Sequence, residues 1–261
     1  MRILFIGDVF GKPGRNAVKR IVPSLIRERN IDYVIANVEN LTSGHGVDKK
    51  RLKEMFDAGV NIGTGGNHIW QNRAVFDFID DERRLLRPAN YPEPCPGKGY
   101  RIYESPTGEP VAVINLLGRV FMPPVECPFK TTEKILRKID GDAKIILVDF
   151  HAEATSEKLA LARYFDGSIS MMAGTHTHIQ TADEQIFRGG TASITDVGMT
   201  GPYDSIIGMA QDEVITKFLT GRPSRFKAAK NDVWLHAVLL TVDNTNGNAS
   251  AIERIKIAME A

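Results

Sequence analysis

Short apolar runs bounded by glycine and polar residues recur along this chain, and five of them lead into a side chain that can bind a metal ion. Such runs are typical of strands buried inside a sheet. The runs and the polar residues after them are 3–7 with Asp8, 33–38 with Glu39 and Asn40, 60–66 with Asn67 and His68, 145–150 with His151, and 169–174 with His176 and His178. We therefore predict five buried strands with polar groups at their carboxyl ends.

Between these runs, apolar residues recur at helical spacing. A helix from about 14 to 30 is predicted by one apolar stripe, which consists of Val18, Ile21, Val22, Leu25 and Ile26. Its length suits a crossover between two parallel strands. Further helices are predicted over 48–58, 70–79, 132–139 and 156–165. In the helix at 70–79, we expect Val75, Phe76 and Ile79 to form the buried face.

The segment from 83 to 131 differs from the rest of the chain because nine prolines interrupt it. Proline at this density favours loops and edge strands over helices. Two strand-like runs, at 100–104 and 111–116, lie within it. We predict that this segment is a lateral extension of a sheet or a cap beside the functional site.

Three more strand-like runs lie near the end of the chain, at 191–196, 233–242 and 250–256, and they predict a second, β-rich sheet. Alternation of strands and helices followed by such an end favours two mixed sheets face to face with helices outside. The fold class is therefore α/β of the α+β kind. The whole chain, 1–261, is expected to form a single domain.

Composition restricts the possible functions. The 261 residues are 43% hydrophobic and 25% charged, as in ordinary soluble domains. No run approaches the roughly 18 apolar residues of a membrane span, and the apolar start is too short for a signal peptide. Two cysteines make a disulfide framework improbable. We therefore expect a cytoplasmic protein with no membrane partner, and the net charge of +1 argues against a broad grip on duplex DNA.

The polar residues after the five runs would meet at one rim, because functional groups in α/β sheets gather past the carboxyl ends of the strands. Carboxylate, amide and imidazole ligands together suit iron, manganese, zinc or cobalt, and their number suits a two-metal hydrolytic centre. Four of the six histidines lie at these positions. In an extended segment, His176 and His178 would point the same way, since side-chain direction repeats every two residues.

Each of these residues also has an interpretation without a metal. Asp8 alone could cap a helix, and Glu39 with Asn40 could form a turn. His151 alone could be a buried histidine whose hydrogen bonds are satisfied. The joint occurrence of all five positions is what favours the metal centre.

Other polar residues have more limited expected roles. His236 is predicted to be a strand residue without a catalytic role, whereas His45, in a glycine loop close to Glu39, could touch the substrate. Glu153, Thr155 and Asp183 are candidates for orienting imidazole ligands through their free ring nitrogens, with helix capping as the alternative for Glu153 and Thr155.

The ordered motifs resemble those of calcineurin-like metallophosphoesterases. They are Gly7-Asp8, Glu39-Asn40, Gly66-Asn67-His68, His151 and Gly174-Thr175-His176-Thr177-His178. Longer strings at 7–15, 149–158 and 195–202 narrow the resemblance to the YmdB-type branch, whose members hydrolyse phosphodiesters including 2′,3′-cyclic nucleotides. The resemblance covers essentially the full chain and implies a four-layer α-β-β-α sandwich.

Carried onto this sequence, the resemblance implies two divalent transition-metal ions per chain, iron first, with manganese, zinc or cobalt as alternatives. The ligands of the first ion would be Asp8, Glu39, Asn40 and His178. The ligands of the second would be Glu39, Asn67, His151 and His176. His68 would be the proton donor. The sequence departs from the wider superfamily at Phe10, where a histidine ligand is usual. The amide oxygen of Asn40 would replace that histidine as a ligand of the first ion.

The function implied is a phosphodiesterase acting on 2′,3′-cyclic nucleotides or RNA ends. Two metal ions would lower the pKa of a shared water from 15.7 toward about 7, and the resulting hydroxide would attack phosphorus while His68 protonates the leaving oxygen. The alternatives are a phosphomonoesterase or protein phosphatase on the same scaffold, and a metal-bearing regulatory RNA-binding protein. The expected partner is a small nucleotide or an RNA end, and a homo-oligomer is left open.

Overall fold

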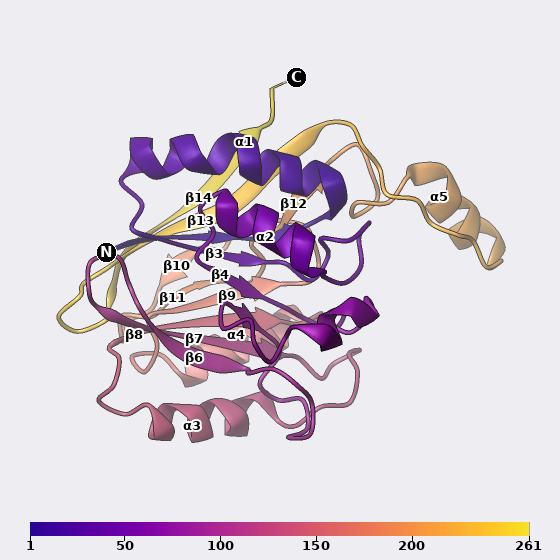
Figure 1. Cartoon of the computed structure of the whole chain (residues 1–261). Helices are drawn as coiled ribbons and strands as arrows, with labels where there is room; N and C mark the ends of the chain where they lie inside the picture. Colours follow the sequence, from indigo (N-terminus) through magenta and orange to yellow (C-terminus); the bar gives the residue numbers. More distant parts are fainter. Residues whose placement is uncertain (261) are drawn as a thin grey trace.

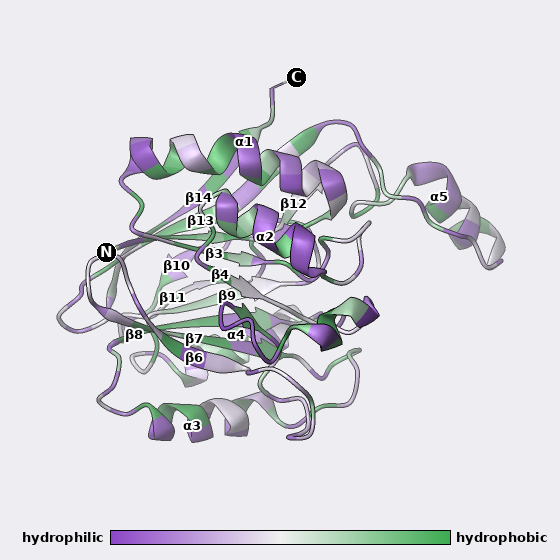
Figure 2. Ribbon diagram, in the orientation of Figure 1, coloured by the Kyte–Doolittle hydropathy of each residue, from purple (hydrophilic) through white to green (hydrophobic). Residues whose placement is uncertain are grey.

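The computed structural model describes residues 1–260, which form four layers: two β-sheets lie face to face, and helices cover the outer face of each (Figure 1). This arrangement confirms the predicted α-β-β-α sandwich of mixed sheets. Figure 2 shows mainly hydrophobic strands in the centre and helices along which hydrophobic and hydrophilic residues alternate. The helices are therefore amphipathic, as the predicted stripes require.

The first sheet has eight strands: β1 (Arg2–Ile6), β2 (Asp8–Val9), β3 (Tyr33–Asn37), β4 (Ile62–Thr64), β5 (Leu85–Leu86), β12 (Met199–Pro202), β13 (Val233–Val242) and β14 (Ala249–Ala258). Their order is β2-β12-β13-β1-β3-β4-β5, and β14 pairs with β13. β1, β3, β4 and β5 are parallel, whereas β13 is antiparallel to its three neighbours.

The second sheet has six strands: β6 (Tyr100–Glu104), β7 (Pro110–Leu117), β8 (Ile145–His151), β9 (Met171–Thr175), β10 (Gln185–Ile186) and β11 (Ala192–Ile194). Their order is β10-β11-β9-β8-β7-β6, with four parallel strands in the middle and an antiparallel strand at each edge. The proline-rich segment thus supplies one edge of this sheet through the β6–β7 pair.

Five α-helices complete the fold: α1 (Gly11–Arg29), α2 (Lys49–Asp57), α3 (Pro128–Lys138), α4 (Thr155–Tyr164) and α5 (Gln211–Thr220). α1 and α2 bury Val18 and Leu52, among others, against the first sheet, and α3 and α4 bury Ile135 and Leu161 against the second. A third hydrophobic core lies between the sheets. α5 projects from the body and buries only Val214 (Figure 1).

The prediction that the strands near the end of the chain build the second sheet is wrong. β13 and β14 belong to the first sheet, where Val238 of β13 pairs with Phe5 of β1, and only β11 joins the second. The reason lies in the composition of β13, which is almost continuously apolar and buried along its ten residues. A strand of that kind is suited to a central position covered on both faces.

The prediction of an α-helix over 70–79 is also wrong, because the structure has a short 3-10 helix at Arg73–Asp77 between turns. Val75 and Ile79 are buried as expected, but Phe76 is 49% exposed and its ring stacks on Trp70 at 5.4 Å. The tighter turn of a 3-10 helix changes which residues share a face. None of the helices within residues 1–260 combines the length and hydrophobicity that a membrane crossing requires.

Parallel pairing brings the carboxyl ends of the central strands to one rim. In the first sheet Asn37 at the end of β3 pairs with Thr64 at the end of β4. In the second sheet, His151 at the end of β8 pairs with Thr175 at the end of β9. Residues that follow these strands therefore gather at a common edge.

Candidate metal centre

The structure brings the predicted site residues together at this rim, and both sheets contribute. Asp8 begins β2 directly after β1, Glu39 and Asn40 follow β3, and Asn67 and His68 follow β4. His151 is the last residue of β8, and His176 and His178 follow β9. Asp8, Glu39 and Asn40 are buried to 1% exposure or less, as is His151.

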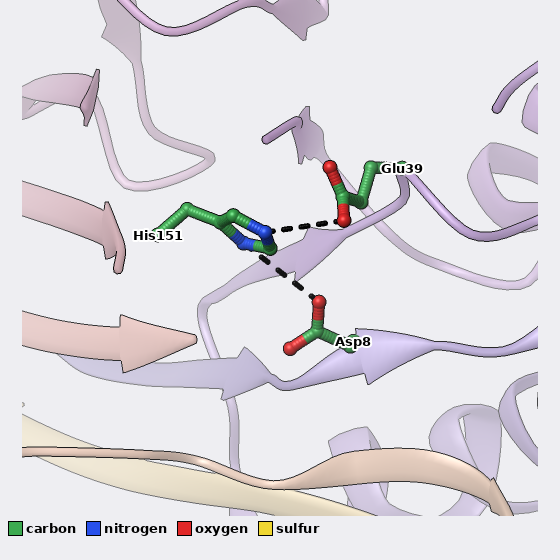
Figure 3. A group of neighbouring side chains, drawn as sticks. All are labelled: Asp8, Glu39 and His151. Carbon is green, nitrogen blue, oxygen red and sulfur yellow. Dashed lines mark ion pairs between the residues drawn. The ribbon is translucent and has the colours of Figure 1, made fainter. Parts of the chain in front are cut away.

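Asp8, Glu39 and His151 form the centre of the cluster (Figure 3). Each offers one ligand atom, and these three atoms lie within 4.8 Å of one another. Glu39 Oε1 is 3.1 Å from His151 Nε2, and Asp8 Oδ1 is 3.8 Å from His151 Nδ1. Two carboxylates and an imidazole this close together, away from solvent, form a negatively charged pocket of donors that suits a divalent cation.

The remaining candidates surround these three residues. Asn67 Oδ1 and His176 Nδ1 each lie 3.0 Å from His151 Nε2. On the other side, His178 Nε2 is 3.8 Å from Asp8 Oδ1. The donors thus form one group around His151, which includes Glu39, and a second group around Asp8.

Asn40 lies between Glu39, His178 and His68, but with its amide nitrogen toward the first two. Its Nδ2 is 3.4 Å from Glu39 Oε1 and 3.4 Å from His178 Nε2, while its Oδ1 is 2.8 Å from His68 Nδ1. Only the amide oxygen can bind a metal ion. A ligand role for Asn40 therefore requires the reverse orientation of its side-chain amide.

The expectation that His176 and His178 share an extended segment is wrong. β9 ends at Thr175, and the two histidines have φ values of 101° and 68°. Non-glycine residues rarely adopt positive φ, and such positions cluster at functional sites, where the surrounding structure maintains them. Both rings still reach the cluster, because the turned backbone replaces the alternation of a strand.

His151 is oriented by residues that the sequence analysis did not single out. Its Nδ1–H donates to Thr175 Oγ1 at 2.9 Å, and the Thr175 hydroxyl donates to Asp149 Oδ1 at 2.7 Å. Asp149 is fully buried, and its other oxygen accepts from Asn37 Nδ2 at 3.0 Å and from the Thr64 hydroxyl. This chain leaves Nε2 as the ligand atom of His151 and fixes its ring. Asp149 stands two residues before His151, on the same face of β8, and that spacing is the pattern that could have identified it.

Of the three residues expected to orient imidazoles, one lies beside an imidazole. Glu153 Oε2 is 3.2 Å from His176 Nε2. Asp183 instead accepts from the hydroxyl of Thr181 and the amide of Thr195, and Thr155 begins α4. Within residues 1–260, neither of these two has a hydrogen bond to a histidine ring.

Burial and mutual charge set the pKa values of the cluster. Burial raises the pKa of Asp8, although neighbouring histidines act in the opposite direction. Burial would also raise the pKa of Glu39, but His151 beside it holds that pKa well below its usual range. Burial lowers the pKa of His151, yet Glu39 and Asp8 together raise it to about 9, whereas burial and the charge of His151 lower the pKa of His176 to about 3. A cation at this position would compete with a proton for His151, so metal affinity should decrease as the pH is lowered.

Two observations show that the residues fit a metal ion. The Oδ1 atom of Asp8 is buried and has no hydrogen-bond partner within residues 1–260. Buried polar atoms are normally paired, so this oxygen is available to a cation. A Cβ atom added at Gly66 would lie 2.4 Å from Glu39 Oε2 and 2.4 Å from His151 Cδ2, so the chain keeps space beside these two ligands. The donors are oxygen and imidazole nitrogen, as borderline divalent metals prefer.

Two stacked sheets with this donor set at their shared rim define a metallophosphoesterase-type fold. The same fold occurs in a Staphylococcus aureus protein described as a candidate 5′-nucleotidase, with a TM-score of 0.66 and 17% identity over 100% of this chain and 55% of that one. The chain itself belongs to the YmdB-like family, whose sequence model matches residues 4–255.

Closer relatives span nearly the whole length. The 2′,3′-cyclic-nucleotide 2′-phosphodiesterase of Bacillus subtilis is 48% identical over 98% of this chain and 97% of that protein. The crystal structure of a hypothetical protein from Thermus thermophilus has a TM-score of 0.94 and 42% identity, with both chains covered to 100%. That of a novel phosphatase from Mycoplasma pneumoniae has a TM-score of 0.93 and 36% identity over 99% of this chain and 93% of that one.

Proposed function

We propose that this protein is a metal-dependent phosphodiesterase that hydrolyses 2′,3′-cyclic nucleotides or RNA ends, and that it acts in the cytoplasm. The observation that carries the proposal is the buried cluster of Asp8, Glu39 and His151, in which one carboxylate oxygen has no partner within residues 1–260. The 48% identity to a B. subtilis enzyme named for this activity supports the substrate class.

The proposed ligands divide between two ions. One set is Asp8, Glu39, Asn40 and His178, and the other is Glu39, Asn67, His151 and His176. When bound, two divalent ions neutralise charge on the phosphoryl oxygens and lower the pKa of a water that can attack phosphorus. Iron fits this donor set, as do manganese, zinc and cobalt.

His68 is the proposed proton donor. Its side chain is 25% exposed, unlike the buried Asp8, Glu39 and His151, and its backbone N–H donates to Glu39 Oε2 at 2.8 Å. Its Nδ1 is 3.2 Å from Glu39 Oε1, which can hold a proton there, and it also contacts the Asn40 side-chain amide at 2.8 Å. Nε2 is then the atom that can carry a second proton to the leaving oxygen. A poor alkoxide leaving group needs such a donor.

A second candidate function is hydrolysis of phosphomonoesters on the same site, which the 36% identity to the M. pneumoniae protein described as a phosphatase favours. A monoester carries one more negative charge than a diester near neutral pH. The two activities therefore differ in how much positive charge the site must supply.

A substrate panel tests the proposal and separates it from the second candidate. We expect the metal-loaded protein to hydrolyse 2′,3′-cyclic AMP and a model diester faster than a model monoester, with all activity lost on chelation. Preference for the monoester would reverse the assignment. Binding of RNA without hydrolysis of any member of the panel would instead favour a regulatory RNA-binding protein.

A further inference from the structure

One histidine outside the proposed ligand set lies directly beside the proposed proton donor. The rings of His45 and His68 are 5.2 Å apart between centroids and inclined at 62°, an edge-to-face contact. His45 is exposed, whereas most of the residues around it are buried. It therefore presents an aromatic ring to solvent next to His68.

The loop that carries His45 has a fixed conformation. Gly44 and Gly46 on either side have φ values of 92° and 72°, which favour glycine. A Cβ at Gly44 would lie 2.5 Å from Phe10 Cζ, and one at Gly46 would lie 2.6 Å from the backbone nitrogen of Asn72. Within the loop, the His45 N–H donates to the carbonyl of Thr42 at 2.9 Å. The ring is thus held on a packed turn, and a preorganised contact loses little entropy when a ligand binds.

The chemistry of the proposed reaction determines what lies next to His68. Hydrolysis of a 2′,3′-cyclic phosphate forms a bond from a water oxygen to phosphorus and breaks one of the two ester bonds. The released ribose oxygen takes a proton from His68, while the other ester bond still joins the ribose to phosphorus, so the nucleoside stays in the site as part of the product. The base is attached to the same ribose, and the exposed ring in contact with His68 is that of His45.

We propose that His45 is a specificity-determining residue, whose imidazole ring packs against the base of the bound nucleotide. This inference rests on the proposed phosphodiesterase function. An aromatic ring stacks on any base, so the contact selects nucleotides over other cyclic phosphodiesters without selecting among bases.

The test compares two substrates that differ only in the base: 2′,3′-cyclic AMP and the 2′,3′-cyclic phosphate of methyl riboside, which has none. We expect His45→Ala to lower kcat/KM for cyclic AMP at least about fivefold, the lower limit for loss of one stacked base. The value for the base-free substrate should not change. His45→Phe, which keeps an aromatic ring, should retain most of the preference for cyclic AMP.

Two controls accompany these variants. Lys50→Ala changes an exposed residue at the start of α2 and should leave both kcat/KM values unchanged. The metal content and unfolding midpoint of each His45 variant should equal those of the original protein, because His45 is exposed and outside the proposed ligand set.

An equal loss on both substrates in His45→Ala would overturn the inference, because it would assign His45 to the chemistry that both substrates share. Unchanged kcat/KM values on both would overturn it as well. If the unaltered protein hydrolyses neither substrate, the proposed function itself is wrong. That outcome is measured on the unaltered protein and does not depend on any variant.

Discussion

His151 is held at both ring nitrogens, and this makes it the best-defined residue of the centre. Nδ1 is bonded to Thr175, which is bonded in turn to the buried Asp149, and Nε2 faces Glu39 and Asn67. A histidine bound in this way has one tautomer and one ring orientation. With Nδ1 bonded in this way, Nε2 is the nitrogen that gives up its proton to a metal ion at this position.

Replacement of His68 by alanine separates proton donation from metal binding. We expect His68→Ala to keep its metal content but to hydrolyse 2′,3′-cyclic AMP about 10²–10⁴-fold more slowly, because the alkoxide leaves without a proton. An aryl diester, which leaves as a stable phenolate, should be slowed much less. Steady-state rates on both substrates and elemental analysis provide the measurements, and loss of metal in this variant would make His68 a ligand instead.

At the level of elements, the loop after β9 depends on a buried ion pair between α4 and the segment after β11. Lys158 Nζ is 2.9 Å from Asp196 Oδ2, and both residues are 1% exposed. Asp196 Oδ2 also accepts from the backbone N–H and the hydroxyl of Thr177, at 3.0 and 2.7 Å. Thr177 lies between the two positive-φ histidines, so this pair anchors the turn that aims their rings.

Removing one partner of this pair should be strongly destabilising. We expect Lys158→Met to lower the free energy of unfolding by about 3–5 kcal/mol, because it leaves the Asp196 carboxylate buried without its cation. The double variant Lys158→Met with Asp196→Asn should recover part of the loss. Urea unfolding measures both, and a change within about 0.5 kcal/mol, as for a surface substitution, would contradict this account.

The sequence correctly predicted those elements in which the pattern of hydrophobic residues matches the burial found in the structure. The stripe from Val18 to Ile26 became α1, and the apolar run ending in His151 became β8. The turn at 70–79 and the backbone at His176 were not predicted, because tertiary contacts rather than local periodicity determine them. α5 was not predicted either, although it buries only Val214. The ligand-type residues were found because each follows a buried strand, whereas Asp149 and Thr175 were missed because they lie within strands and act through His151.

At the scale of the whole molecule, buried polar groups join the two sheets at the site. A hydrophobic cluster lies between the sheets, and at the rim Asn37 and Thr64 of the first sheet bond to Asp149 of the second. Fully satisfied buried networks of this kind rigidify a structure. The relative position of the sheets, and so of their ligands, is fixed where the proposed chemistry takes place.

His236 on β13 gives the folded state a specific dependence on pH. Burial, with a smaller effect of Lys256, lowers the pKa of His236 to about 4. The unfolded chain binds a proton below about pH 6.5 that the folded chain does not, so folding stability falls as pH decreases from there toward 4. We expect the unaltered protein to lose about 2 kcal/mol more than His236→Gln between pH 7 and pH 5. Urea unfolding at the two pH values measures this difference, and equal losses would show that His236 takes up its proton in the folded state.

The central claim is that oxygen and nitrogen donors from both sheets bind two neighbouring metal ions. Its most direct test is elemental analysis of the protein purified without oxygen, together with the Asp8→Ala variant, whose lost carboxylate carries the unpartnered buried oxygen. We predict two transition-metal ions per chain in the original protein and about one in the variant. Full hydrolysis of 2′,3′-cyclic AMP by protein that contains no metal, or equal metal content in the two proteins, would contradict it.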